Sequence, residues 1–396
     1  MKFYDVVVVG AGMAAMAAVK TFRAGDSGSS ILLISDQPDV PVRKPPLSKQ
    51  LWSGQLTTAD IVYNPAKFNV VFQPKTTVQK VDFGRKLVTL SSGDKVRYNR
   101  LVIATGLTPV KINGDASRLV HLNTLADYRA LKARVGTAGS IVVIGGGLLG
   151  VEIASAFAQN GWRNDLIFPA KWPLDHFVPQ SIGVRVMDAL HRHGVKCHAE
   201  TRAQEVTSDG RVRVQAGESI YGDLIVPLIG QRPSLDFLDD TLLDETGGVH
   251  VDRQLHAFGL DDVFACGDII SVTGSRERCP HEDNAVRSGA HVGQVLLGSN
   301  AAFTPSTFVY SEFLGMRLES IGVGRARDCE VGAEEWNEEK NNGIALMTRH
   351  NFIERVTLIN HEIDTSRVDE LSKRVIGKRC PPKSSELLRF VKKFTA

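Results

Sequence analysis

Residues 6–18 read VVVVGAGMAAMAA, and this stretch decides the fold. Four consecutive valines suit a strand that is buried on both faces of a parallel sheet. Gly10 then permits a tight turn, Gly12 lets the backbone approach a pyrophosphate, and Ala15 keeps the following helix close to the strand. The alanine-rich segment beyond is a good helix former, and the N-terminus of such a helix attracts phosphate. The stretch therefore predicts a strand–turn–helix unit that binds a dinucleotide.

A carboxylate follows where the ribose of such a dinucleotide would lie. The apolar run at residues 31–34 predicts the next strand, and Asp36 follows two residues after its end, about 20 residues beyond the glycine turn. An acid at that distance accepts hydrogen bonds from ribose hydroxyls. A glycine pattern alone is weak, because any tight strand-to-helix turn can imitate it. The ordered succession of strand, turn, helix, strand and acid is more specific.

The same unit recurs at residues 141–168, with the turn GGGLLG between an apolar strand and the helix VEIASAFAQNG. Two such units imply two dinucleotides, commonly a flavin dinucleotide that accepts hydride from a nicotinamide dinucleotide. The second unit has no acid at the ribose position, where Lys171 stands instead. A lysine tolerates or attracts a 2′-phosphate, so both NADH and NADPH remain open. Lys171 is equally well interpreted as a solvated turn residue.

Two further stretches suit the flavin. LVIATG, at residues 101–106, predicts a strand that ends in a small-residue turn. VFACGD, at residues 263–268, predicts a strand that ends in Gly267 and Asp268. An aspartate there can bind the ribitol hydroxyls, and Gly267 permits close approach. The alternative for Asp268 is a helix cap, which aspartate also favours.

Composition excludes several classes of protein. The chain has 396 residues and a formal net charge of +3, which suits two or three domains and shows no strong preference for acidic partners. Its five cysteines form no C-x-x-C pair, and no metal site or nucleic-acid module is evident. No apolar run is long enough for a transmembrane segment. We expect a cytoplasmic protein if the chain is complete as given, or a mitochondrial one if a eukaryotic leader has been removed.

The segments GAGMAAMAA, ILLISD, RKPPLSKQLW, LVIATG, GGGLLGVEIA, FACGDI and PHEDNAVRSG, in this order, resemble the flavoprotein reductases that contain two dinucleotide folds. Within that class the chain is most similar to the apoptosis-inducing factor branch, and ferredoxin and rubredoxin reductases share the same plan. The resemblance implies an α/β fold with two Rossmann-like domains, the nicotinamide domain inserted in the flavin domain, and a C-terminal α+β interface domain. The expected ranges are 1–121 with 247–304 for FAD, 122–246 for NAD(P), and 305–396 for the interface domain.

The resemblance also implies roles for single residues. Lys49 matches a lysine near the reactive flavin nitrogen, and Glu152 matches the glutamate that pairs with it, although Glu152 could be a simple first-turn glutamate. The adjacent prolines Pro45 and Pro46 would form a rigid wall beside the flavin ring. Tyr310 stands where the family has a tryptophan near the ring. The segment KPPLSK has no cysteine, which disfavours the disulfide-reductase and peroxidase relatives.

The expected site residues fall into three groups. The catalytic group is Lys49, Glu152, His281 and Tyr310. His281 would face the flavin ring, although a histidine alone is more often a surface or core residue. The FAD group is Gly10, Gly12, Ala14, Ala15, Asp36, Lys44, Ala104, Thr105, Gly106, Arg129, Gly267, Asp268 and His281. The nicotinamide group is Gly145, Gly147, Leu149, Gly150, Lys171 and Gly230.

Three functions fit these features. The first is an FAD-containing NAD(P)H oxidoreductase of apoptosis-inducing factor type, in which hydride passes to flavin N5 and a stable charge-transfer complex of reduced flavin with NAD forms. Its electrons would go to a quinone, to oxygen or to a small redox protein. The second is a ferredoxin or rubredoxin reductase of an oxygenase system. The third is a redox-gated interaction protein with little turnover that forms a homodimer when reduced.

The C-terminal segment predicts two short amphipathic helices. Val368, Leu371 and Val375 share one helical face, and residues 385–394 repeat the spacing with Leu387, Phe390 or Val391, and Phe394. Docking of the last helix on its own protein is the main interpretation, and association with a membrane surface is the alternative.

Overall fold

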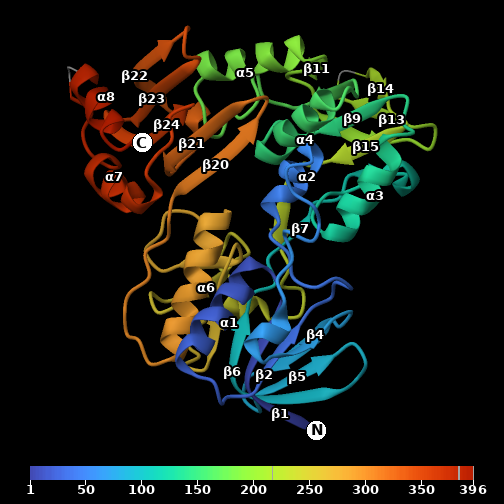
Figure 1. Ribbon diagram of the computed structural model, residues 1–396, viewed down its shortest axis with the longest axis vertical. Helices are drawn as coiled ribbons and strands as arrows, with labels where there is room; N and C mark the ends of the chain where they lie inside the picture. The colour runs from blue at the N-terminus through green and yellow to red at the C-terminus, as the bar shows by residue number, and fades with distance from the viewer. Residues whose placement is uncertain (216, 382–383, 396) are drawn as a thin grey trace. The chain divides into compact units, whose positions relative to one another are not determined.

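The computed structural model describes residues 1–215, 217–381 and 384–395, and the chain divides into two compact units (Figure 1). Both units combine segments that are distant in sequence. The division into three domains that the sequence suggests stays a prediction. The first unit is Met1–Pro45, Thr57–Thr108 and Gln231–Ser306, and the second is Pro46–Leu56, Pro109–Gly230 and Thr307–Ala396.

The first unit contains a seven-stranded mixed sheet in the order β3-β2-β1-β6-β5-β4, with β18 also paired to β6. Strand β1 runs parallel to β2 and β6, and its residues 6–9 are almost fully buried. Strand β6 is long enough to pair antiparallel with β5 at its start and parallel with β18 at its end. The strands are β1 (Lys2–Val9), β2 (Ile31–Ile34), β3 (Val71–Gln73), β4 (Val78–Asp82), β5 (Leu87–Leu90), β6 (Lys95–Ile103) and β18 (Val263–Ala265).

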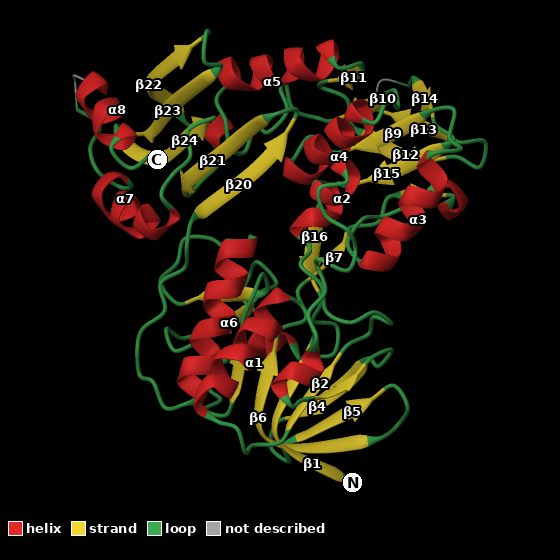
Figure 2. Cartoon of the chain, in the orientation of Figure 1, coloured by secondary structure: helices red, strands yellow, loops and turns green. Residues whose placement is uncertain are grey.

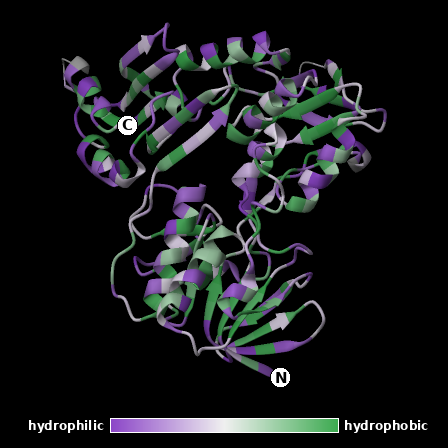
Figure 3. Cartoon of the chain, viewed as in Figure 1, coloured by the Kyte–Doolittle hydropathy of each residue, from purple (hydrophilic) through white to green (hydrophobic). Residues whose placement is uncertain are grey.

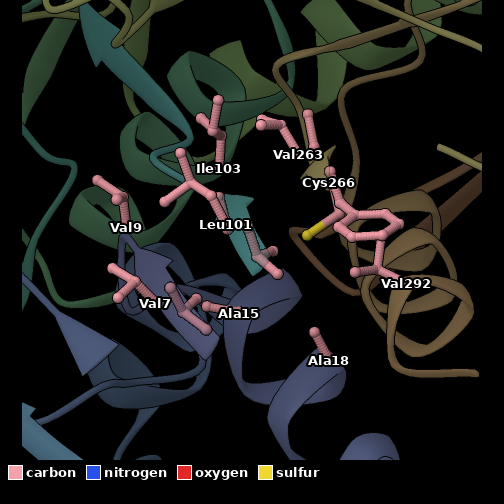
Figure 4. Packing of buried hydrophobic residues seen from close by; sticks show 14 of the residues in the cluster. Val7, Val9, Ala15, Ala18, Leu101, Ile103, Val263, Cys266 and Val292 are labelled. Carbon is pink, nitrogen blue, oxygen red and sulfur yellow. The ribbon is translucent and has the colours of Figure 1, made fainter. Parts of the chain in front are cut away.

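Helices α1 and α6 approach each other closely at two glycines of α6. A Cβ atom on Gly289 of α6 would lie 2.1 Å from the carbonyl oxygen of Ala14, and one on Gly293 would lie 2.7 Å from that of Ala18. Figure 4 shows Ala15 and Ala18 in the same apolar cluster as Val292. The two glycines and the small residues of α1 therefore let two helices that are far apart in the sequence meet backbone to backbone. The unit's remaining elements are α1 (Met13–Gly25), α6 (Glu282–Leu296), β7 (Leu107–Pro109), β16 (Gln231–Pro233), β17 (Val249–Val251) and β19 (Ile270–Val272).

The second unit contains a four-stranded parallel sheet in the order β11-β10-β9-β15, as the repeated glycine turn predicts (Figure 2). Strands β9 and β15 are short, apolar and fully buried, and Figure 3 shows hydrophobic residues in this sheet. The elements are α2 (Gln50–Ser53), α3 (Leu125–Val135), β9 (Ile141–Ile144), α4 (Leu148–Gln159), β10 (Asn164–Ile167), α5 (Gln180–Arg192), β11 (Val195–His198) and β15 (Leu224–Pro227). A small side sheet consists of β8 (Asn113–Gly114), β12 (Ala203–Val206), β13 (Arg211–Val214) and β14 (Ser219–Tyr221).

The second unit also contains a five-stranded antiparallel sheet in the order β20-β21-β24-β23-β22, followed by two helices. The helical faces expected from the sequence are buried against this sheet, but in the last helix Leu388 is the buried leucine and Leu387 is only partly covered. The apolar face of that helix therefore packs on its own protein, and in the described residues no helix could cross a membrane. The elements are β20 (Phe308–Phe313), β21 (Met316–Gly322), β22 (Glu330–Asn337), β23 (Asn342–Arg349), β24 (Phe352–Ile359), α7 (Val368–Val375) and α8 (Ser384–Lys392).

The packing of α1 on α6 generates a stability prediction. Gly289→Ala should lower the free energy of unfolding by about 1–3 kcal/mol, because the new methyl group would overlap the carbonyl oxygen of Ala14. Gly28→Ala is the matched control, since a Cβ there meets no atom within 4 Å. Urea denaturation of both variants measures the difference. Equal urea midpoints for the two variants would show that α1 and α6 can move apart without loss of stability.

Candidate functional site

The first glycine turn leaves an open space at the N-terminus of α1. Gly10 has φ +99°, and a Cβ atom on it would lie 2.3 Å from the carbonyl oxygen of Ala104. Gly12 precedes the helix, and a Cβ there would meet no atom within 4 Å. Gly10 therefore lets β1 and the end of β6 come together, and Gly12 keeps the approach to the helix N-terminus clear. This arrangement suits a pyrophosphate group.

Asp268 lies beside this turn and has an unsatisfied carboxylate oxygen. A Cβ on Gly267 would lie 3.0 Å from the Cβ of Ala14, so the end of β18 reaches the start of α1. Oδ1 of Asp268 is buried and accepts no hydrogen bond from the residues that the structure describes. Burial raises the pKa of Asp268, and the positive charges of Lys44 and Arg278 oppose that shift only in part. A buried acceptor without a donor is costly, so the group fits a ligand that carries hydroxyls.

Other predicted FAD residues surround the same turn. Oγ1 of Thr105 is buried and has no hydrogen-bond partner among the described residues, and Gly106 has φ +68°. Asp36 follows β2 with an exposed side chain, two residues after Ile34, whose carbonyl oxygen accepts a hydrogen bond from Gly10 N at 2.9 Å. Together with Asp268, the orphaned hydroxyl of Thr105 shows that the residues present fit FAD.

His281 caps the N-terminus of α6. Its Nδ1 accepts a hydrogen bond from the backbone N–H of Asp283 at 3.5 Å, and its backbone N–H donates to the carboxylate of Asp268. His281 therefore orients Asp268 through its main chain. Contact of its ring with a flavin stays a prediction.

The second glycine turn repeats the first. A Cβ on Gly145 would lie 2.2 Å from the carbonyl oxygen of Leu228, and one on Gly150 would lie 1.8 Å from that of Gly145. A Cβ on Gly147 would meet no atom within 4 Å at the N-terminus of α4. Gly230, with φ +125°, follows β15 in the same unit. The N-terminus of α4 can therefore hold the second pyrophosphate, as predicted for the nicotinamide dinucleotide.

The loops where the ribose of the second dinucleotide is predicted to lie carry both a basic and an acidic residue. Lys171 is exposed in the loop after β10, and the half-buried Leu149 lies in the first turn of α4. The backbone N–H of Glu200 donates to the carbonyl oxygen of Ala170 at 2.9 Å, so a loop with an acid runs beside Lys171. The sequence pattern did not mark Glu200, because it comes after β11 and not after β10.

Glu152 lies on α4 and is 5% exposed, with its carboxylate paired to Lys49. Lys49 Nζ lies 2.8 Å from Glu152 Oε1. Two serine hydroxyls also donate to the carboxylate, Ser48 to Oε2 at 2.5 Å and Ser311 to Oε1 at 2.6 Å. The sequence analysis missed both serines, since a buried serine has no pattern of its own. The simple first-turn interpretation of Glu152 does not explain these contacts.

Trp52 anchors the segment that carries Lys49. Its indole is 6% exposed and makes edge contacts with Tyr128 and Phe157, each with ring centres 5.3 Å apart. The Tyr128 hydroxyl donates to the carbonyl oxygen of Leu51 at 3.1 Å. The residue after Tyr128 is the exposed Arg129, whose contact with FAD stays a prediction. Trp52 therefore fixes the segment against α3 and α4, which the sequence analysis did not foresee.

Tyr310 lies on β20 on the sheet face opposite to Ser311, because neighbouring strand residues point to opposite faces. The guanidinium of Arg317 lies over its ring, 5.2 Å from the centre, and Phe308 stacks at 6.2 Å. The structure therefore directs Tyr310 and Ser311 to different surroundings. A role for Tyr310 beside the flavin ring stays a prediction.

Two glycine turns with open helix N-termini, a buried lysine–glutamate pair and a buried aspartate, one of whose oxygens has no partner among the described residues, define a flavoprotein with two dinucleotide sites. The profile of the pyridine nucleotide-disulphide oxidoreductase family matches residues 4–289, and the chain belongs to this family. It is similar to rubredoxin-NAD(+) reductase of Pseudomonas putida, with 29% identity over 344 residues that cover 83% of this chain and 89% of the relative. It is similar to NADH-rubredoxin oxidoreductase of Clostridium acetobutylicum, with 25% identity over 381 residues and 95% of each chain covered.

Two further comparisons bear on the fold and on the subtype. The crystal structure of a ferredoxin reductase from Rhodopseudomonas palustris matches with a TM-score of 0.86 and 21% identity, over 99% of this chain and 100% of that one. Mitochondrial apoptosis-inducing factor 1 of Dictyostelium discoideum is 28% identical over 366 residues, which cover 81% of this chain and 67% of the relative. The predicted α/β fold is confirmed, and so is an FAD-dependent NADH oxidoreductase. The apoptosis-inducing factor subtype is not specifically supported.

The raised pKa of Asp268 generates a prediction for the FAD-free protein. Its carboxylate is disfavoured in the fold, so stability should fall as pH rises from the ordinary value of 3.8 through the raised value. Asp268→Asn removes that fall, so its unfolding midpoint in urea should exceed that of wild type increasingly as pH rises. The same variant should bind FAD about tenfold more weakly, because it loses a charged acceptor. Unchanged FAD affinity in a fluorescence titration would contradict the ribitol assignment.

Lys171 generates a prediction about the choice of dinucleotide. Lys171→Glu should lower kcat/KM for NADPH about tenfold relative to NADH, because an acid repels the 2′-phosphate. Lys111→Glu, at another exposed lysine of the second unit, should change the two values equally. Steady-state kinetics with both dinucleotides measure the ratio. An unchanged ratio in Lys171→Glu would leave Lys171 as a solvated turn residue.

Proposed function

We propose that this FAD-dependent NADH oxidoreductase passes electrons to a small iron–sulfur protein of the rubredoxin or ferredoxin kind. The observation that supports the proposal is the share of each chain over which this protein and its relatives match. The similarity to NADH-rubredoxin oxidoreductase covers 95% of both chains, so it includes the C-terminal sheet as well as the two glycine turns. The apoptosis-inducing factor relative extends well beyond the matched region. The proposal therefore prefers the reductase to the apoptosis-inducing factor type.

Each part of the chain has a task in this reaction. FAD, when bound, accepts hydride from NADH and releases electrons one at a time. Gly12 and Gly147 keep the two helix N-termini open for the phosphates. Asp268 accepts hydrogen bonds from the ribitol, which satisfies its buried oxygen. We assign Lys49 to stabilise the negative charge of the reduced flavin, with Glu152 holding the ammonium in place.

The structure of the KPPLSK segment supports a reductase without disulfide chemistry. The position that a reactive cysteine would occupy in the disulfide-reductase relatives lies in this segment, where Ser48 instead donates to Glu152. Two of the five thiols are also poor nucleophiles, because burial raises the pKa of both Cys197 and Cys266 to about 12. Electron transfer through FAD alone therefore needs no thiol of this chain.

The second candidate is an oxidoreductase of apoptosis-inducing factor type that holds reduced flavin and NAD in a long-lived complex. Its motivation is the sequence resemblance. The surroundings of Tyr310 argue against it, because the ring already has Arg317 over it and Phe308 beside it. A redox-gated interaction protein that dimerises on reduction is a third candidate, and the same experiment tests it. The mitochondrial location implied by the resemblance gains no support from the bacterial relatives.

Anaerobic stopped-flow mixing with NADH, followed by rubredoxin or ferredoxin, tests the proposal. We expect rapid flavin reduction, rapid reoxidation by one of the two acceptors and no change of mass in light scattering. A long-wavelength absorbance that persists, slow reoxidation by both acceptors and a doubled mass would instead support the apoptosis-inducing factor type. Reoxidation by free quinone or oxygen as fast as by either protein would contradict a dedicated redox partner.

A further inference from the structure

The carboxylate of Glu152 joins three segments of the second unit that are distant in sequence. Helix α4 carries Glu152, the segment Pro46–Leu56 carries Lys49 and Ser48, and the edge strand β20 carries Ser311. Both serines are almost completely buried, Ser48 at 3% exposure and Ser311 at 0%. All three partners reach the carboxylate at 2.5–2.8 Å. The group is therefore a compact buried cluster and not a chance surface contact.

The donors divide unequally between the two carboxylate oxygens. Oε2 receives the Ser48 hydroxyl, and Oε1 receives both the Ser311 hydroxyl and the Lys49 ammonium. Hydroxyl-to-oxygen distances of 2.5 and 2.6 Å are typical of charge-assisted hydrogen bonds. Ser311 and Lys49 thus share one oxygen. The oxygen has lone pairs for both donors, and a hydroxyl that donates to it takes up part of its negative charge, so it attracts the ammonium less strongly.

Strand β20 gives Ser311 a fixed direction. Among the described strands it is an edge strand paired with β21, and Ser311 lies opposite Leu318 in that pairing. The next residue, Glu312, accepts a hydrogen bond from Gln50 Nε2 at 3.4 Å, so β20 contacts the lysine segment at a second point. Main-chain pairing and this second contact hold the Ser311 hydroxyl against Glu152. The C-terminal sheet therefore supplies a rigid donor to a carboxylate of the nicotinamide-binding region.

We propose that Ser311 is a positioning residue for Lys49 and acts through Glu152. Its hydroxyl satisfies part of Oε1, so the ammonium is held by the carboxylate without being drawn fully into an exclusive pair. The ammonium of Lys49 then remains available to stabilise the negative charge of the reduced flavin. This inference rests on the proposed function, because Lys49 is taken there to stabilise the reduced flavin. It gives the antiparallel C-terminal sheet a contribution to the lysine–glutamate pair of the second unit.

The consequence of removing the hydroxyl follows from the shared oxygen. In Ser311→Ala, Lys49 remains the donor to Oε1 among the residues that the structure describes. The ammonium should move closer to Glu152 and stabilise the reduced flavin less. The midpoint potential of the flavin should therefore become more negative, and reduction by NADH should slow about tenfold, the size expected for a hydrogen bond to a charged group.

The experiment compares holoprotein variants by anaerobic redox titration and stopped-flow reduction. Ser155→Ala is the matched control, since Ser155 is buried on the same helix as Glu152 and its hydroxyl has no partner among the described residues. It should keep the wild-type potential and rate. Ser311→Thr retains the hydroxyl and should restore the potential. Lys49→Met should shift the potential in the same direction as Ser311→Ala and further.

Each outcome decides between the hypotheses. A wild-type potential in Ser311→Ala, together with a shifted potential in Lys49→Met, overturns the positioning role and leaves the proposed function intact. An unshifted potential in Lys49→Met also overturns it, because there would be no lysine effect to transmit. Failure of the wild-type protein to be reduced by NADH overturns the proposed function itself. If Ser311→Ala does not fold, Ser311→Cys provides a weaker donor of similar size, and its wild-type potential would overturn the inference.

Discussion

Both dinucleotide sites depend on the same steric constraint, which is a glycine pressed against a carbonyl oxygen at the carboxyl end of a parallel sheet. A Cβ would lie 2.3 Å from an oxygen at Gly10 and 2.2 Å at Gly145, distances that no side chain can occupy. Because each of these positions has no side chain, the backbone can pass in a tight turn from the strand into the helix. The following glycine then leaves the helix N-terminus open to phosphate. In the first unit the start of this helix is in turn held by the glycines of α6.

Local patterns could predict these turns because their cause is local. The spacing of Gly10, Gly12 and Asp36 reports backbone geometry within one strand–turn–helix unit, and Asp268 follows a strand that the same pattern identifies. The contact of Gly289 with Ala14 could not be predicted, because the two residues are far apart in the sequence. A helical glycine suggests a close approach but does not identify the other helix.

The polar cluster around Glu152 shows a second limit of sequence reasoning. Family resemblance implied the pairing of Lys49 with Glu152, and the two groups lie 2.8 Å apart. Nothing in the sequence connected Ser311 with them. On an edge strand, a shift of one residue exchanges the two sheet faces, so the register decides whether Ser311 or Tyr310 meets α4. The family resemblance pointed to Tyr310, whereas the strand register directs the hydroxyl of Ser311 to the carboxylate.

A buried lysine–glutamate pair is poor evidence for stability, because the desolvation of two charges can exceed their attraction. The three donors at Glu152 offset that cost, but apolar residues of similar volume would avoid it altogether. The pair also includes Lys49 in a segment that Trp52 already anchors without help from charge. A buried ammonium at this point therefore fits a chemical role better than a stabilising one. Two tasks therefore fall within one short segment: Trp52 holds the segment in place, and in the function proposed above Lys49 supplies the positive charge.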